Sequence, residues 1–153
     1  MSKDMWEFNG LPLHPLVVHA AVVFGPLAAL VAILYALWGR RRDQLRWATL
    51  GLVMLAFLSI WAAYLTGDNY FGSDHFTRVS QELRDKIEHH EELADQLRWI
   101  TTGFFAVTVI AGWQHARAGA ARYALNGLVV VAAVLTLVWV AMTGDAGSQA
   151  VYG

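Results

Sequence analysis

The sequence predicts an all-α fold, a transmembrane four-helix bundle in which successive helices run up, down, up and down. Hydrophobic residues make up 57% of the 153 residues and charged residues only 15%, which is too apolar for an ordinary soluble domain. Four stretches contain no Asp, Glu, Lys or Arg, and each approaches the roughly 20 residues that a helix needs to cross about 30 Å of hydrocarbon. These stretches are residues 16–38, 47–65, 99–116 and 123–142.

Helix signals place these spans in a single integral membrane domain that covers residues 1–153. Pro15 suits the first turn of the first helix, where a missing N–H costs nothing. The second and fourth spans each run into Thr-Gly-Asp, at residues 66–68 and 143–145, and glycine commonly follows a helix end. The helices are therefore expected at about residues 12–38, 45–66, 80–116 and 122–143.

The third helix is expected to begin near Ser80, well before its apolar stretch. Side chains of low polarity and one histidine recur there at spacings of three and four, which indicates a single inward stripe. Charged residues fill the other faces. His90 belongs to the stripe, whereas His89, rotated by about 100° around the helix, is expected to face water. The stripe consists of Val79, Leu83, Ile87, His90, Ala94 and Leu97.

Basic residues predict the orientation in the membrane. The N-terminal segment has one lysine and the C-terminal tail has no basic residue. The positive-inside rule then puts the first and third connections in the cytoplasm and both termini outside it. Zero cysteines exclude disulfides and thiolate chemistry, and a net charge of −1 gives no sign of nucleic-acid binding. The arginines that carry this argument are Arg40, Arg41, Arg42 and Arg46 in the first connection, and Arg117 and Arg122 in the third.

Two parts of the chain resemble each other at a separation of 76 residues. Residues 46–53 match residues 122–129, and each half also contains one Thr-Gly-Asp motif. We therefore expect two related helical hairpins that run in the same direction. The same separation relates His14 to His90. In an up-down-up-down bundle the first and third helices lie on a diagonal, so these two histidines are expected to face each other.

Polar groups converge at the predicted extracytoplasmic end of the bundle. His14 at the start of the first helix, His19 about one turn further along, and His90 supply imidazoles. Asp68 and Asp145 supply carboxylates. Each residue alone also has a plain structural interpretation, because a histidine can cap or cross-link helices and an aspartate after a helix-ending glycine is often a solvated turn residue. Their convergence on one end favours a functional site.

Two chemistries suit this convergence. A pair of neutral imidazoles from facing helices can ligate haem b, with His90 on one side of the iron and His14 or His19 on the other. Imidazoles and carboxylates together can instead hold a divalent ion such as zinc, copper or iron. The candidate metal ligands are His14, His19, Asp68, His90 and Asp145.

Other functions are disfavoured. The sequence has no glycine-rich phosphate loop and no nucleophile motif, so an enzyme is not expected. The middle of the membrane holds only weak polar groups such as Ser59, Thr108 and Thr136, which more often bond back to helix carbonyls, so transport is not expected either. His115, at the opposite end of the bundle, is interpreted as an interfacial residue.

Four segments resemble those of a known family. Residues 10–19, Gly-Leu-Pro-Leu-His-Pro-Leu-Val-Val-His, form an opening motif, and residues 66–68 form a small-Gly-acid motif. Residues 90–95, His-Glu-Glu-Leu-Ala-Asp, form a histidine-led entry to the third helix, and residues 144–153 form the C-terminal ending. All four are similar to the corresponding segments of the bacterial DUF2231 membrane proteins. In that family a histidine often stands where this chain has Asp145.

The resemblance implies four transmembrane helices in a bacterial cytoplasmic membrane. It carries over His14, His19, Asp68 and His90 as candidate site residues. Some DUF2231 relatives are joined to Rieske-type iron–sulfur domains, which implies membrane redox work. The aspartate at position 145 weakens that position as a haem ligand, although a metal site would tolerate it.

These observations together lead us to expect an integral membrane redox protein that binds haem b at the extracytoplasmic end. It would serve as an electron carrier or as a subunit of a redox complex. The alternatives are an extracytoplasmic His/Asp site for a divalent metal ion, and an accessory subunit without a cofactor. The expected partners are the lipid bilayer, redox or respiratory membrane proteins and, in a homo-oligomer, further copies of this chain.

Overall fold

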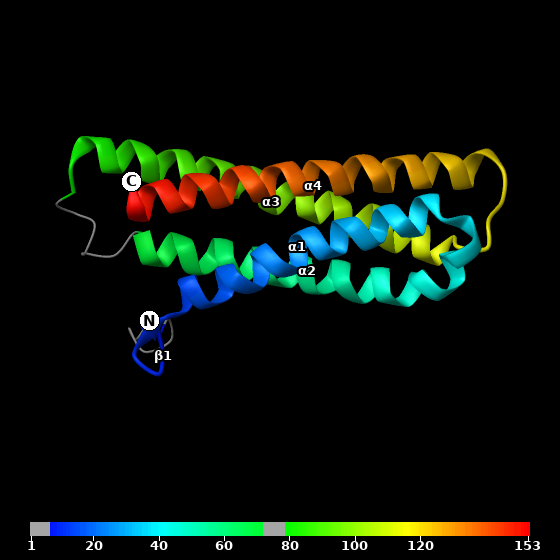
Figure 1. Ribbon diagram of the computed structural model, residues 1–153, viewed down its shortest axis with the longest axis horizontal. Helices are drawn as coiled ribbons and strands as arrows, with labels where there is room; N and C mark the ends of the chain where they lie inside the picture. The colour runs from blue at the N-terminus through cyan, green and yellow to red at the C-terminus, as the bar shows by residue number, and fades with distance from the viewer. Residues whose placement is uncertain (1–6, 72–78) are drawn as a thin grey trace.

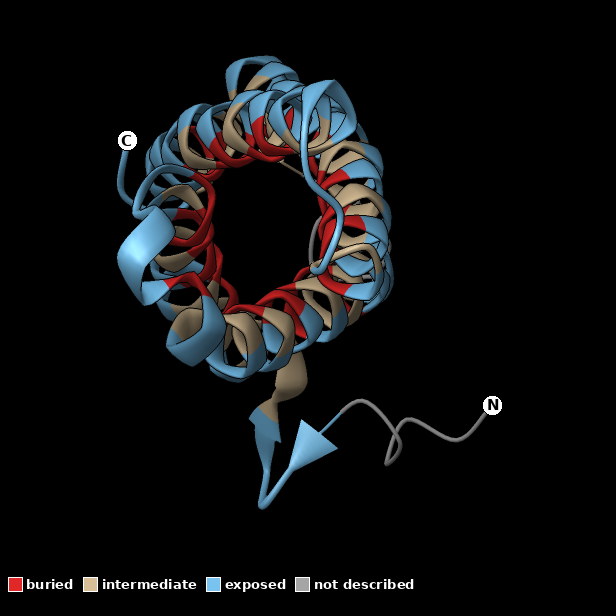
Figure 2. Ribbon diagram, turned by 90° about the vertical axis from the view of Figure 1, so that its right-hand side faces the viewer, coloured by how far each residue is buried: buried red, intermediate tan, exposed pale blue. Residues whose placement is uncertain are grey.

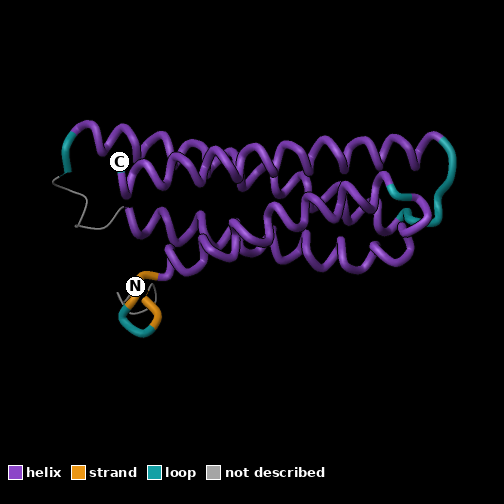
Figure 3. The backbone as a smooth tube through the Cα atoms, viewed as in Figure 1, coloured by secondary structure: helices purple, strands orange, loops and turns teal. Residues whose placement is uncertain are grey.

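The computed structural model describes residues 7–71 and 79–153, which form a bundle of long helices (Figure 1). Both ends of the described chain lie at one end of the bundle, and the connections α1–α2 and α3–α4 lie at the other (Figure 3). The predicted all-α four-helix architecture is therefore confirmed. The helices are α1 Leu13–Leu37, α2 Arg42–Phe71, α3 Gln81–Trp113 and α4 Ala120–Tyr152, with a short 3₁₀ helix η2, Gly39–Arg41, before α2.

A small β-hairpin that the sequence reasoning did not predict precedes α1. β1 (Glu7–Phe8) pairs antiparallel with β2 (Leu11–Pro12). The two residues between the strands, Asn9 and Gly10, have φ angles of 54° and 78°. Both angles are positive, as a tight two-residue hairpin turn requires, and Asn-Gly is the pair that adopts them at least steric cost. The hairpin leads the chain directly into the first turn of α1.

The helices associate as two antiparallel pairs. α1 packs mainly on α2 and α3 mainly on α4, and the two pairs meet along α1–α4 and α2–α3. Buried positions follow the inner faces of the helices around the bundle axis (Figure 2). The largest core cluster sets small residues of α1, among them the fully buried Ala28 and Ala32, near Phe104 of α3. Small side chains at these positions let the helix backbones approach closely.

Three segments of the described chain are long and apolar enough to cross a membrane: α1, residues 39–70 and α4. The first half of α3 carries many charged side chains, so its apolar part is limited to about the last fifteen residues, from Trp99 onward. Because α2 and α4 run in the same direction, the chain must return between them. α3 makes this return alongside the other helices (Figure 1). Among the described residues α3 is not one of the three segments that qualify by length and composition, so the fourth span stays a prediction.

Two helix ends differ from the prediction. α2 continues through its Thr-Gly-Asp motif to Phe71, and α4 continues through its motif to Tyr152. Glycine weakens a helix but does not stop it when tertiary contacts hold the following turn. The start of α3 is confirmed: Ser80 is its N-cap, and the Ser80 hydroxyl accepts a hydrogen bond from the Leu83 N–H.

Candidate functional site at the histidine end

We call the end of the bundle where α1 begins and α4 finishes the histidine end, because His14 and His90 lie there. His14 is the second residue of α1 and is half-buried. Its Nδ1–H donates to the main-chain carbonyl of Ala63 on α2 at 3.0 Å, and the Thr66 hydroxyl oxygen lies 3.2 Å from the same nitrogen. Its ring stacks on Tyr70, with 5.8 Å between the ring centroids. His14 therefore joins α1 to α2.

His90 does the same for the second pair. It is half-buried on the inward stripe of α3, while His89 is exposed, as the spacing predicts. The His90 Nδ1–H donates to the main-chain carbonyl of Thr143 on α4 at 3.0 Å. Since a carbonyl oxygen can only accept, the proton of each imidazole is fixed on Nδ1, and Nε2 is the nitrogen that keeps a lone pair. The two histidines thus have the same tautomer and the same kind of anchor.

Each imidazole also packs on a glycine of the partner helix. A Cβ atom added to Gly67 of α2 would lie 2.9 Å from Cε1 of His14, and one added to Gly147 of α4 would lie 2.9 Å from Cε1 of His90. No real side chain tolerates so short a contact. Glycine at these two positions is therefore what lets the imidazole rings reach the helix backbones.

The number of residues that separates equivalent positions of the two helix pairs differs between the two ends of the bundle. Far from the histidines, Leu50 of α2 packs on Gly112 of α3, and Asn126 of α4 donates to the carbonyl of Ala36 of α1. These two contacts are equivalent, because 76 residues separate Leu50 from Asn126 and 76 residues separate Ala36 from Gly112. At the histidine end the separation between equivalent residues of α2 and α4 is 80, which relates Gly67 to Gly147. The two separations differ by about one helical turn.

This shift changes what the matching sequence motifs mean. The two Thr-Gly-Asp motifs align Gly67 with Gly144, but no atom of residues 7–71 or 79–153 lies within 4 Å of a Cβ added at Gly144. Asp145 is exposed, and its carboxylate accepts a hydrogen bond from the side chain of Gln149 on the same helix. The predicted site residue Asp145 therefore does not occupy a position equivalent to that of Asp68.

His19 is also separated from the other candidate residues. It is exposed on the outside of α1, and its Nδ1–H donates to the carbonyl of Pro15 in its own helix at 2.5 Å. The bundle thus brings His14 and His90 inward and leaves His19 outside. Within the described residues, no three His, Asp or Glu side chains are grouped closely enough to hold a metal ion.

Electrostatic interactions connect the helices at this end. Burial lowers the pKa of His90 below its usual 6.5, the hydrogen bond to Thr143 opposes this shift, and the neighbouring His89 lowers the pKa further. Charge on His90 also acts on His14, so a proton on one imidazole disfavours a proton on the other. Burial raises the pKa of Glu91, and the charge of Asp68 on α2 adds to this effect. Asp68 of α2 and Glu91 of α3 therefore interact electrostatically across the two helices.

The opposite end, which we call the arginine end, holds a polar cluster that the sequence reasoning missed. The hydroxyl of the buried Tyr35 lies 3.0 Å from Nδ1 of His115, and His115 Nε2 lies 2.5 Å from the Asp43 carboxylate. Arg42, only 5% exposed, donates to the main-chain carbonyl of His115 at 2.7 Å. A signal was present: Tyr35 continues the small-residue stripe of α1 that contains Ala32, so its phenol had to point inward and find a partner.

Comparison with known families identifies the family to which the chain belongs. A family model described as a predicted membrane protein (DUF2231) matches residues 10–153. The chain belongs to the DUF2231 family. The resemblance inferred from the four motifs is confirmed, and with it the assignment as a multi-pass membrane protein. His14, His90, Gly67 and Gly147 all lie in the matched region. Neither the curated proteins nor the solved structures contain a match to this chain.

Proposed function

We propose that this DUF2231 protein binds one haem b at the histidine end, where His14 and His90 would hold the iron through Nε2. It would act as a membrane electron carrier or as a subunit of a redox complex. The proposal rests on one observation: two imidazoles from different helices are each anchored through Nδ1–H to a main-chain carbonyl of the partner helix.

The chemistry of this donor set fits haem better than a bare metal ion. A metal-ligating histidine usually donates its second ring N–H to a carbonyl or carboxylate, which fixes the tautomer and orients the ring. A zinc site takes three or four protein ligands, and the described residues offer no group of three. Haem iron takes only axial ligands from the protein, because the macrocycle supplies the rest. Two imidazoles are then sufficient.

Burial and charge favour the ligating form of the imidazoles. The lowered pKa of His90 keeps its ring neutral at pH 7, so Nε2 does not have to lose a proton before it binds iron. The Thr143 hydroxyl is buried on the residue that anchors His90, and it lacks a hydrogen-bond partner among the described residues. Such a group is available to a polar substituent of a ligand.

The residues of the chain would have distinct tasks. His14 and His90 bind and orient the group, and Gly67 and Gly147 hold their rings against the helix backbones. Bound haem would supply one-electron transfer, the chemistry that the protein side chains themselves lack. Its partners would be other membrane redox proteins, and no enzymatic turnover by this chain is required. We further propose, from the positive-inside rule, that both termini and the histidine end lie outside the cytoplasm of a bacterial cell.

Absorption spectroscopy tests the proposal. The protein, produced with added haem precursor and purified, is expected to show a Soret band, and both His14→Ala and His90→Ala are expected to lose most of it. The matched controls are His19→Ala on the same helix as His14 and His89→Ala beside His90, since both side chains are exposed. Circular dichroism and size-exclusion chromatography would check that each variant folds.

Two results would overturn the proposal. One is a folded, colourless wild-type protein that also fails to bind haemin added after purification. The other is a Soret band that persists in folded His14→Ala and His90→Ala variants. A reporter fusion at the C-terminus tests the orientation separately, since a cytoplasmic signal would contradict it.

A further inference from the structure

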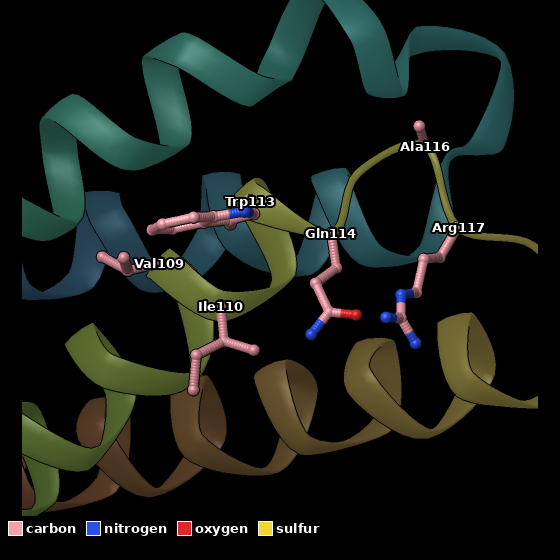
Figure 4. A pocket seen from close by; sticks show the side chains of 6 residues that line it. All are labelled: Val109, Ile110, Trp113, Gln114, Ala116 and Arg117. Atoms are coloured by element: carbon pink, nitrogen blue, oxygen red, sulfur yellow. The ribbon is translucent and has the colours of Figure 1, made fainter.

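A groove opens at the arginine end, outside the site already described. It has a volume of about 480 Å³ and lies at the last turn of α3 and the start of the following loop (Figure 4). In Figure 4 the side-chain ends of Gln114 and Arg117 lie beside each other, away from the apolar side chains. The lining residues are Val109, Ile110, Trp113, Gln114, Ala116 and Arg117.

The lining of this groove is divided between apolar and cationic parts along the helix axis. Val109 and Ile110 are exposed although both are apolar, and Trp113 is 85% exposed. Arg117 follows them toward the end of the bundle. Exposed apolar side chains need lipid or another apolar cover, and tryptophan prefers the level of the lipid headgroups. A cation just beyond that level meets the phosphate layer.

A second groove repeats this combination on the other helix pair. Trp38, Arg40 and Arg41 line a space of about 420 Å³ just after α1. The Arg41 guanidinium lies 5.9 Å from the centre of the Trp38 ring and donates to the Gln44 side chain at 2.7 Å. α1 ends at Leu37 and α3 ends at Trp113, residues that the 76-residue repeat makes equivalent. The same pairing of tryptophan with arginine thus occurs twice at one depth.

The charge balance of this end indicates the sign of the ligand. The connecting segments, residues 38–47 and 113–123, contain six arginines and one acidic residue. That acidic residue, Asp43, pairs with His115. A strong excess of positive charge therefore remains beside exposed apolar surface. Basic pockets at the cytoplasmic ends of membrane helices suit anionic lipid headgroups.

We propose that the two grooves at the arginine end are binding sites for anionic phospholipid, with Arg117 in one and Arg41 in the other contacting the lipid phosphate, and with Trp113 and Trp38 at the boundary between the headgroup and the acyl chains. This inference does not depend on haem binding. An arginine can grip a phosphate with two parallel N–H groups, and the neighbouring glutamine side chains, Gln114 and Gln44, add further hydrogen-bonding capacity.

Native mass spectrometry of the full chain tests this site, with phosphatidylglycerol and phosphatidylcholine of the same acyl chains as probes. The wild-type protein is expected to retain phosphatidylglycerol in preference to phosphatidylcholine. Arg117→Gln and Arg41→Gln are each expected to weaken phosphatidylglycerol binding about fivefold, since one basic residue near an anionic headgroup contributes about that factor. The double variant is expected to lose the preference, and phosphatidylcholine binding should not change.

Lys86→Gln is the charge-matched control, because Lys86 lies at the histidine end and pairs with Glu82 on its own helix. It is expected to retain wild-type lipid preference. Equal binding of the two lipids by the wild-type protein would overturn the proposal. So would an equal loss in Lys86→Gln, since net charge alone would then explain the preference. Displacement of the lipid by millimolar inorganic phosphate would assign the grooves to free anions instead.

Discussion

Imidazoles lie at both ends of this bundle, but the two ends hold them differently. At the arginine end, both ring nitrogens of His115 lie within hydrogen-bond distance of side chains, those of Tyr35 and Asp43. At the histidine end, His14 and His90 are each anchored by one nitrogen to a helix carbonyl. When both nitrogens of an imidazole contact neighbouring side chains, as in His115, the ring's role is to hold helices together. A ring anchored through Nδ1–H to a main-chain carbonyl has a fixed tautomer and orientation, as histidines that ligate a metal commonly do.

The contacts between helices also differ between the two ends. The arginine end is held by side chains that reach across helices, such as Arg42 to the His115 carbonyl and Asn126 to the Ala36 carbonyl. The histidine end relies on glycines that bring rings onto backbones. We infer that the arginine end is the structural end and that the histidine end is specialised for a ligand. The following variants test this contrast.

The largest loss of stability is expected when Arg42 is replaced. Replacing Arg42 with Met removes the donor to the His115 carbonyl and the cation 4.9 Å from the Tyr35 ring centre. A buried carbonyl left without its donor costs about 1–3 kcal/mol. Thermal unfolding in detergent would measure the loss. Arg41→Met, at an exposed position, is the control and should stay within about 0.5 kcal/mol of the wild type. Equal losses in both variants would argue against a structural lock at this end.

The next effect is expected at Gly147. Gly147→Ala forces a methyl group against the His90 ring, so the ring must move and its hydrogen bond to Thr143 should weaken. Overpacking of this kind costs about 1–3 kcal/mol. Gly144→Ala is the matched control on the same helix, where the added methyl group meets no atom of the described part of the chain. It should be neutral or stabilise the helix by up to about 1 kcal/mol. If Gly144→Ala were the more damaging change, the 80-residue register would be wrong.

A smaller effect is expected on the pH dependence of stability. The folded-state pKa of His90 lies below 6.5, so the unfolded chain binds this proton more tightly than the folded one. Stability is then complete above about pH 6.5 and falls as the pH drops through the folded-state value. His90→Phe should flatten this part of the stability profile between pH 7.5 and 5, whereas His89→Ala should reduce the slope only slightly, because His89 is the smallest of the three influences on the His90 pKa. The remaining slope would report Glu91 and the other groups at this end.

The smallest effect is expected at Asp43. Its side chain is 94% exposed, and a contact made by so exposed a carboxylate contributes little in water. Asp43→Asn should change the melting temperature by less than the uncertainty of about 1 °C, because the Tyr35–His115 contact remains. A loss comparable to that of Arg42→Met would show that the carboxylate, and not the buried arginine, holds the arginine end.

Local pattern accounts for the parts of the fold that were predicted correctly. The charge-free stretches gave the number and direction of the helices, and the spacing of three and four gave the inward face of α3 with His90 on it. The start of α3 near Ser80 followed from the same segment. Helix ends inside α2 and α4 were predicted wrongly, since Gly67 and Gly144 were taken as helix ends. In α2 that glycine is instead the contact for an imidazole, and in α4 the corresponding contact is made one turn later by Gly147.

The candidate site could be predicted only in part from the sequence. Sequence alone offered His14 and His19 as equivalent choices, and the fold separates them, since one ring reaches α2 and the other stays on the surface of α1. Neither the pairing of Gly67 with His14 nor that of Gly147 with His90 has a sequence signature. The matching Thr-Gly-Asp motifs pointed to Gly144 instead.

The sequence by itself determined that this chain crosses a membrane as antiparallel helices, that basic residues gather at one end, and that histidines gather at the other. Composition and periodicity are local properties, and they decide these points because water, lipid and the helix repeat act on each segment separately. Only the tertiary structure decided which histidine turns inward, which glycine lies beneath it and how His115 is held. Those points depend on the register between helices, and one turn of sliding costs no local helix energy while it exchanges every contact across the bundle.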